Sequence, residues 1–247
     1  MLPHLAAWLS HHLPSQCLAC HAWRTGGPLC PTCMQRFAPA PQQTRCSGCG
    51  LPLATAGDAA KPPRCGACLR RPPPWQHCHV WVDYGYPWAD IITRWKLQQH
   101  PALAAHIARW VLSSPPLAAA LQQADVLLPL PLSPQRLRER GFNQAAQLAR
   151  YWAQHFARQP GSPGPRWRSD ILLRPQHTAA QRSLGRSARL RNLHAAFAVA
   201  PEAQLADLHL LVIDDVITTG ATLRAACAAL RAAGAQHISV LALARTP

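Results

Sequence analysis

Four repeated cysteine pairs place the strongest restriction on how this chain can fold. Eight of the ten cysteines form C-x-x-C pairs, and these are Cys17/Cys20, Cys30/Cys33, Cys46/Cys49 and Cys65/Cys68. Each pair can direct two thiolates at one metal ion, and two pairs complete a tetrahedral zinc site. The spacing therefore predicts two structural zinc ions in the N-terminal segment. It leaves open whether neighbouring pairs share an ion or the pairs interleave.

Thiol–disulfide chemistry does not explain this pattern. A redox catalyst would have a single C-x-x-C pair beside a βαβ unit, and the segment holds four pairs. The segment also has little apolar core, so zinc would supply its folding free energy, on the order of 10 kcal/mol per site. Cys78 and Cys227 stand alone, and we expect both to be buried as small hydrophobic residues.

A proline-rich connector separates this segment from the rest of the chain. The run LRRPPPWQ, residues 69–76, should be stiff and extended. We therefore divide the 247 residues into a double zinc-ribbon region, 1–72, and a larger domain, 73–247. Apolar residues make up 49% of the chain, enough for a packed core.

The larger domain alternates strand-like and helical patterns. Apolar runs predict strands at 79–86, 125–132, 195–199, 208–215 and 237–244. Helical spacing of apolar residues predicts helices at 142–156 and 222–234. Strands that alternate with helices indicate an α/β fold, with a mostly parallel sheet and helices on both faces.

The charge of the chain favours anionic partners. Lysine and arginine number 25 against 10 acidic residues, which suits phosphorylated metabolites, nucleic acid or a membrane surface. Only Lys61 and Lys96 are lysines, as a GC-rich genome would produce without selection for DNA binding. No apolar run reaches the ~18 residues of a membrane span. Residues 1–14 carry no lysine or arginine, so we expect a cytoplasmic protein without an export signal.

The stretch LLVIDDVITTGATLRAA, residues 210–226, predicts a ligand site. Asp214 and Asp215 end a strand-like run, and parallel sheets bind ligands beyond the carboxyl ends of their strands. The loop that follows enters a helix at its N-terminus, where backbone amides favour a phosphate. Gly220 allows close approach, and three threonine hydroxyls lie beside it. A ribose 5-phosphate would satisfy both the loop and the aspartates. The alternative is that the aspartates begin a turn and Thr222 caps the helix.

This stretch resembles the phosphoribosyl pyrophosphate (PRPP) motif of type I phosphoribosyltransferases. The whole chain is identified as a member of the ComF/GntX family by its C-x-x-C pairs, CLRRPPPW, LPLPLSPQRLRERGFNQ, QRSLGRSARLRNLHAAF and LALART. The resemblance implies zinc ribbons joined to a phosphoribosyltransferase-like domain. It also implies a link to DNA uptake and to the use of external DNA as a nutrient.

The resemblance assigns roles to individual residues. It implies that Asp214 and Asp215 bind the ribose hydroxyls. It assigns the 5-phosphate loop to Thr218, Thr219, Gly220, Ala221 and Thr222. It assigns pyrophosphate contacts to Arg136, Arg138 and Arg140, and a mobile flap to Gln181, Leu184, Arg186, Arg189 and Asn192. Lys96 is the one residue kept from the family's Lys-Phe-x-Gly stretch, and we include it in the site.

Three functions are compatible with these residues. The first is transfer of phosphoribosyl from PRPP and Mg²⁺ to an unidentified acceptor, by displacement at the anomeric carbon. The second is PRPP sensing without chemistry. The third is handling of single-stranded DNA beside the DNA-uptake machinery, with the fold as a scaffold. In the empty site we expect the adjacent aspartates to repel each other.

Overall fold

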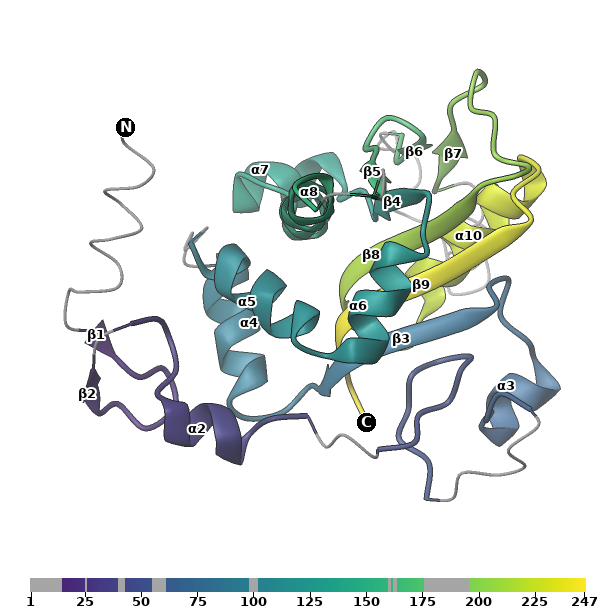
Figure 1. Cartoon of the computed structure of the whole chain (residues 1–247). Coiled ribbons are helices and arrows are strands. Elements are labelled where there is room, and N and C mark those ends of the chain that lie inside the picture. Colours follow the sequence, from purple (N-terminus) through teal and green to yellow (C-terminus); the bar gives the residue numbers. More distant parts are fainter. Residues whose placement is uncertain are drawn as a thin grey trace.

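A five-stranded parallel sheet forms the centre of the molecule (Figure 1). A computed structural model describes residues 15–24, 26–39, 43–54, 61–97, 102–159, 161, 164–175 and 196–247. The strand order is β3-β9-β8-β4-β5, and each neighbouring pair is parallel. The bounds are β3 His77–Asp83, β4 Val126–Pro129, β5 Arg166–Trp167, β8 His209–Ile217 and β9 His237–Arg245. The predicted α/β class is therefore confirmed.

Helices cover both faces of the sheet, as predicted (Figure 1). One face packs against α4 Trp88–Leu97, α5 Leu103–Leu112, α6 Pro115–Gln122 and α8 Gln144–Ala157. The other face packs against α10 Ala221–Ala232. Within the described ranges, no helix combines the length and the apolar character that a membrane crossing requires.

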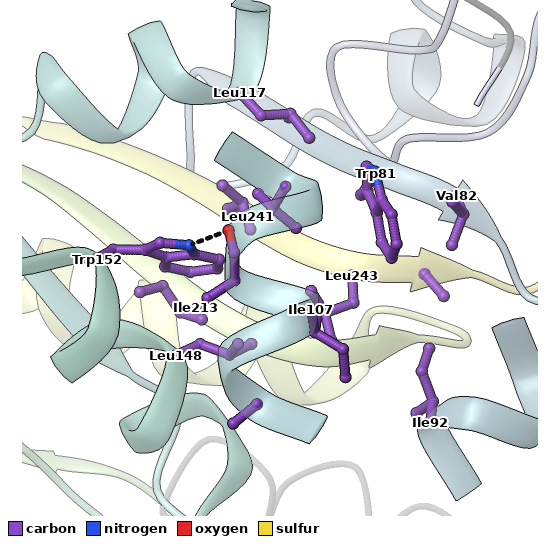
Figure 2. Close-up of a cluster of buried hydrophobic side chains, with 14 of the residues drawn as sticks. Trp81, Val82, Ile92, Ile107, Leu117, Leu148, Trp152, Ile213, Leu241 and Leu243 are labelled. Carbon is purple, nitrogen blue, oxygen red and sulfur yellow. Dashed lines mark hydrogen bonds between the residues drawn. The ribbon is translucent and has the colours of Figure 1, made fainter. Parts of the chain in front are cut away.

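The central strand β8 is buried on both sides. Leu211 and Ile213 join the cluster under α5 and α8, whereas Leu210 and Val212 join the cluster under α10. Such a strand reads as a continuous apolar run because neither face meets water. Figure 2 shows the first cluster, in which the indole nitrogen of Trp152 donates to the backbone carbonyl of a residue of α5 at 3.1 Å.

The strand predicted at residues 195–199 is confirmed at its C-terminal end, but it lies outside the main sheet. The described part of this segment holds β7, Ala198–Val199, which pairs antiparallel with β6, Leu172–Leu173, outside the main sheet. The preceding Phe197 is buried in the cluster under α10, so the apolar run packs against the sheet instead of extending it. The sheet edge beside β4 is taken by the short strand β5.

The second cysteine-rich segment, which holds Cys46, Cys49, Cys65 and Cys68, covers the β3 edge of the sheet. It includes α3, Gly66–Arg70. The backbone amide of Cys78 donates to the carbonyl of Ser47 at 2.7 Å, and Trp75 Nε1 donates to the carbonyl of Gly48 at 2.9 Å. Gly50 has φ +74°, and a Cβ there would lie 2.2 Å from a methyl of Val80. The contact is therefore close enough to require glycine.

The first cysteine-rich segment, which holds Cys17, Cys20, Cys30 and Cys33, packs beside the start of α4. It holds the hairpin β1 Ser15–Gln16 and β2 Trp23–Arg24, followed by α2 Pro31–Arg36. The hydroxyl of Tyr86 donates to the carbonyl of Ala19 at 2.6 Å, and Trp88 Nε1 donates to the carbonyl of Phe37 at 3.0 Å. Both cysteine-rich segments thus contact the larger domain through specific hydrogen bonds.

Candidate functional site

The paired cysteines form two separate clusters. In each cluster the four Sγ atoms lie within 4.8 Å of one another. The first cluster holds Cys17, Cys20, Cys30 and Cys33, and the second holds Cys46, Cys49, Cys65 and Cys68. Neighbouring pairs therefore share a cluster, which excludes the interleaved arrangement. Four sulfur atoms at these distances fit a tetrahedral zinc site.

Backbone amides point at sulfur atoms in both clusters. The amide of Cys30 donates to Cys17 Sγ at 3.3 Å, and the amide of Cys65 donates to Cys46 Sγ at 3.2 Å. Burial opposes ionisation of the Cys17 thiol, but backbone hydrogen bonds, led by that from Cys20, lower its pKa to about 6. Zinc binds thiolates, so these donors suit the ion.

The two remaining cysteines are buried, as predicted. Cys78 lies in β3 and Cys227 in α10, and both belong to the apolar cluster on the α10 side of the sheet. Burial raises the pKa of both thiols above the usual range. They therefore pack as small hydrophobic residues.

The acidic pair lies near the carboxyl end of β8. The strand continues to Ile217, so Asp214 and Asp215 are inside it and do not begin a turn. Because strand side chains alternate, Asp215 follows Ile213 on the α8 side and Asp214 follows Val212 on the α10 side. Both nevertheless line one pocket of about 340 Å³ at this edge of the sheet.

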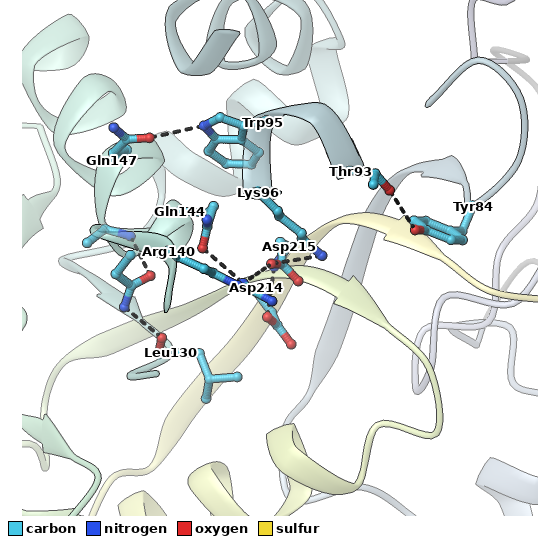
Figure 3. Close-up of polar contacts among 12 residues, drawn as sticks. Tyr84, Thr93, Trp95, Lys96, Leu130, Arg140, Gln144, Gln147, Asp214 and Asp215 are labelled. Carbon is cyan, nitrogen blue, oxygen red and sulfur yellow. Dashed lines mark hydrogen bonds and ion pairs between the residues drawn. The ribbon is translucent and has the colours of Figure 1, made fainter. Parts of the chain in front are cut away.

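Two cations balance the charge of Asp215 (Figure 3). Its Oδ2 lies 2.9 Å from Lys96 Nζ, at the end of α4, and 3.5 Å from Arg140 Nη1. Arg140 Nη1 also donates to Gln144 Oε1 at 3.0 Å. The structure thus brings Lys96 to the pocket, and Gln144 holds the arginine that faces Asp215.

Asp214 bears the repulsion that we expected both carboxylates to share. Burial and then the neighbouring Asp215 carboxylate raise the pKa of Asp214 to about 7. A backbone hydrogen bond from Asp215 and the charges of Lys96 and Arg136 oppose this shift. Asp214 Oδ1 accepts from the amide of Asp215 at 2.8 Å. Asp214 is therefore the carboxyl group whose charge changes near neutral pH.

The loop after β8 leads directly into the N-terminus of α10. Gly220 is the N-cap of α10 with φ +70°, so Thr222 is inside the helix and does not cap it. Thr218 and Thr222 line the pocket, whereas Thr219 is exposed and its Oγ1 accepts from the amide of Ala221 at 3.3 Å. The helix start beside the pocket can bind an anion through its amides and dipole.

A short helix, α7 (Pro134–Arg140), brings arginines to the pocket from the loop after β4. Its N-cap Ser133 accepts from the amide of Arg136 at 3.3 Å. Arg136 and Arg140 are four residues apart and share one side of the helix, and both line the pocket. Arg138 is exposed and lies outside the pocket lining, because two residues along a helix face a different side.

Arg174 lines the same pocket and was not among the predicted site residues. Its Nε is buried and has no hydrogen-bond partner in the described part of the chain. Its guanidinium carbon lies 5.3 Å from the ring centre of Phe197. Burial and then the charge of Arg136 lower the pKa of Arg174, while Asp214 opposes the shift. Sequence reasoning missed it because it is one of several arginines in a basic stretch.

The predicted flap residues Gln181, Leu184, Arg186, Arg189 and Asn192 lie outside the described residues. Arg166 and Arg168 are exposed and line a different pocket from the acidic pair. Arg168 forms a two-point ion pair with Asp170, at 2.8 and 2.6 Å. Buried Gln144 and half-buried Tyr84 also line the pocket, and neither carried a signal in the sequence.

Two family models match the chain. Residues 175–247 match a phosphoribosyl transferase domain, and residues 8–69 match a double zinc ribbon domain. The second match is consistent with the two cysteine clusters. The first begins at the residue after Arg174 and includes β8, the acidic pair, the loop and α10.

Curated relatives match along most of their length. DNA utilization protein YhgH of Salmonella typhi is 35% identical, over 81% of this chain and 84% of the relative. The protein of the same name from Escherichia coli is 32% identical, over 88% and 90%. Competence protein F of Haemophilus influenzae is 30% identical, over 93% and 96%. A solved allosteric regulatory enzyme of purine biosynthesis shares 15% identity and a TM-score of 0.36, over 56% of this chain and 25% of its own.

Proposed function

Because this chain belongs to the ComF/GntX family, with DNA utilization protein YhgH and Competence protein F as relatives, we propose that it binds PRPP together with Mg²⁺. The supporting observation is the composition of one pocket. It joins an acidic pair, a loop at a helix start and a group of cationic side chains. PRPP carries a hydroxyl pair, a phosphate and a pyrophosphate that match these three features.

The pocket suggests how PRPP would lie. The ribose hydroxyls would donate to Asp214 and Asp215, and the 5-phosphate would accept hydrogen bonds at residues 218–222. The pyrophosphate would then lie toward Arg136 and Arg174. Arg174 favours this placement because its buried Nε has no partner among the described residues, and arginine pairs well with phosphate oxygens.

The reaction that this arrangement supports is transfer of the phosphoribosyl group. The bond between the anomeric carbon and a pyrophosphate oxygen breaks, and its electron pair leaves with pyrophosphate. The acceptor forms the new bond to carbon and loses a proton. Arg136 and Arg174 would stabilise the leaving charge by fixed electrostatics. Mg²⁺, when bound with the phosphates, would neutralise part of their charge.

Lys96 and Arg140 have a positioning role in this proposal. Both contact Asp215 Oδ2, which leaves Oδ1 of that carboxylate to accept from a ribose hydroxyl. We also propose that the flap with Gln181, Arg186 and Arg189 closes over the pyrophosphate, as the family resemblance implies. We propose that the protein works in the cytoplasm beside proteins of DNA uptake.

The decisive experiment is calorimetric titration of PRPP with Mg²⁺ into the full-length protein. We expect binding in the wild type, no binding in the Asp214→Asn/Asp215→Asn variant, and unchanged zinc content in both. Gly220→Val should also block binding by crowding the phosphate. Gly234→Val is its matched control, because Gly234 also has positive φ but lies at the far end of α10. Absence of heat in the wild type, or equal binding by the double variant, would overturn the proposal.

A second candidate is single-stranded DNA binding without chemistry. Trp23, in β2 of the first cysteine-rich segment, is 72% exposed and could stack on a base, and the chain carries a net charge of +15. Binding should weaken steeply as salt rises. Release of pyrophosphate from PRPP with some acceptor would identify a transferase. PRPP binding without release would favour a sensor, and DNA binding with neither would favour the scaffold function.

A further inference from the structure

Arg245, at the end of β9, connects the second cysteine cluster to the loop after β8. Its side chain is buried, and its Nε donates to the backbone carbonyl of Cys49 at 3.0 Å. Its Nη1 donates to the carbonyl of Ile217 at 3.2 Å. One guanidinium group therefore contacts a cysteine of the second cluster and the last residue of β8 at the same time.

The carbonyl of Ile217 is the point from which the loop starts. It accepts from Arg245 Nη1, from the backbone amide of Thr246 at 3.0 Å and from Thr246 Oγ1 at 3.3 Å. Three donors on one carbonyl fix the orientation of the peptide that leads into Thr218. Thr246 itself lines the pocket beside the acidic pair.

Charge explains why the state of the cluster should matter to Arg245. Four thiolates around one zinc ion carry a net negative charge, and the guanidinium is the natural countercharge beside it. Among the described residues, Arg245 forms no ion pair with a carboxylate, and its hydrogen-bond acceptors are backbone carbonyls and Thr246. Loss of zinc would release the turn that presents the Cys49 carbonyl to Arg245.

We infer that the second cysteine cluster, through Arg245, positions the loop at residues 218–222, so that zinc in this cluster is required for a formed phosphate site. This inference rests on the proposed function for the identity of the ligand. The coupling between the second cluster and the loop is independent of the proposed function. Arg245 is a positioning residue. It contacts the carbonyl of Ile217, the residue before the loop, and it is not part of the pocket lining.

The first cluster offers a matched control. Its segment contacts the larger domain through Tyr86 and Trp88 at the start of α4. Both of these hydrogen bonds lie beside the start of α4 and involve no residue of the loop. Cys20 in this cluster and Cys65 in the second are not fully buried, so serine fits at both positions. Each change should remove about one zinc ion per chain, but only the change at Cys65 should affect the loop.

The first measurement needs no ligand. Hydrogen exchange of the loop is followed at the backbone amides of Thr246 and Arg224, which donate to the carbonyls of Ile217 and Gly220 at its two ends. The proteins compared are the zinc-loaded wild type, Cys65→Ser, Cys20→Ser and Arg245→Lys, with zinc content measured for each. We expect about tenfold faster exchange in Cys65→Ser and Arg245→Lys, because a local hydrogen-bonded unit opens more easily. Exchange in Cys20→Ser should match the wild type. Buried amides of α8 provide the reference, and their rates should not change.

Arg245→Lys keeps the test valid if Cys65→Ser does not fold. Lysine retains the charge but cannot reach both carbonyls with a planar fork, and zinc should remain bound. Unchanged loop exchange in this variant would overturn the inference, as would equal exchange in Cys20→Ser and Cys65→Ser. Faster exchange throughout α8 would also overturn it, because the effect would then be global unfolding.

The second measurement is calorimetric titration of PRPP with Mg²⁺ into the same four proteins. Affinity should fall about tenfold in Cys65→Ser and Arg245→Lys, equivalent to one disordered hydrogen-bonded contact with a charged group. It should be unchanged in Cys20→Ser. If the wild type does not bind PRPP, the proposed function fails, and the exchange data still decide the coupling.

Discussion

Lys96 Nζ lies 2.9 Å from Asp215 Oδ2, and this ion pair gives the two adjacent aspartates different electrostatic environments. Asp215 faces two cations, whereas Asp214 forms no ion pair with any described side chain. A carboxylate paired with two cations stabilises the folded state, and a partly buried carboxylate beside a like charge destabilises it.

Single substitutions should therefore change stability in opposite directions. We expect Asp215→Asn to lower the free energy of unfolding of the ligand-free protein by about 1–3 kcal/mol, because Lys96 and Arg140 lose their partner in a partly shielded site. Asp214→Asn should leave it unchanged or raise it by about 1 kcal/mol, since burial of a charge is avoided. Urea denaturation of both variants measures this. A larger loss in Asp214→Asn would contradict the assignment of the ion pairs.

The raised pKa of Asp214 makes stability depend on pH. The folded protein keeps this carboxyl group protonated up to about pH 7, while an unfolded aspartate releases its proton near pH ~4. Between these values the folded state binds more protons, so its free energy of unfolding falls as pH rises. Above about pH 8 the effect is complete.

Thermal unfolding of the wild type and Asp214→Asn between about pH 5 and pH 8 tests this dependence. The wild type should lose stability relative to Asp214→Asn as pH increases over this range. Comparison of the two proteins cancels the titration of histidines and other shared groups. A constant difference in stability at all pH values would show that Asp214 titrates normally.

Arg174 should contribute to PRPP affinity more than its place in the sequence indicates. We expect Arg174→Gln to weaken PRPP binding about 10- to 100-fold, the effect of losing hydrogen bonds between a cation and a phosphate. Arg168→Gln is the control, since Arg168 is exposed and paired with Asp170. Titration calorimetry at one fixed salt concentration separates the two. Equal losses would mean that only net charge matters.

Zinc removal should affect the two cysteine clusters independently. Elemental analysis should find about two zinc ions per chain, and Cys68→Ser should retain about one and unfold the second cysteine-rich segment locally. Limited proteolysis within α3, Gly66–Arg70, would detect that unfolding. A fully folded protein without metal would contradict the assignment of both clusters as structural zinc sites.

The parts of the site that could be predicted are those that the sequence keeps together. Asp214, Asp215 and the loop to Thr222 are contiguous, so a strand, a loop and a helix start could be recognised from local patterns. The family resemblance assigns Arg136, Arg138 and Arg140 together, and the structure places only Arg136 and Arg140 in the pocket lining. The cysteine spacing predicts two clusters because the members of each C-x-x-C pair are close together in the sequence.

The remaining parts depend on contacts between distant segments. Gln144 reaches the site only because α8 packs across the sheet. Arg174 reaches it because β6, which pairs with β7 outside the main sheet, places this arginine beside Phe197. Arg245 contacts Cys49 across 196 residues of sequence. No periodicity or motif marks such positions. The apolar run at residues 195–199 indicated a strand, but a short run does not show that the strand will pair with β6 outside the main sheet.

The cover that the second cysteine-rich segment places over β3 has a consequence for production of the protein. An outer strand with unpaired backbone groups is a template for aggregation. Here the amide of Cys78 in β3 donates to the carbonyl of Ser47, which belongs to a segment that needs metal to fold. A transferase-like domain cut free at residue 73 would present that strand to other copies of itself. We therefore expect zinc supply during synthesis to affect the solubility of the protein as well as its structure.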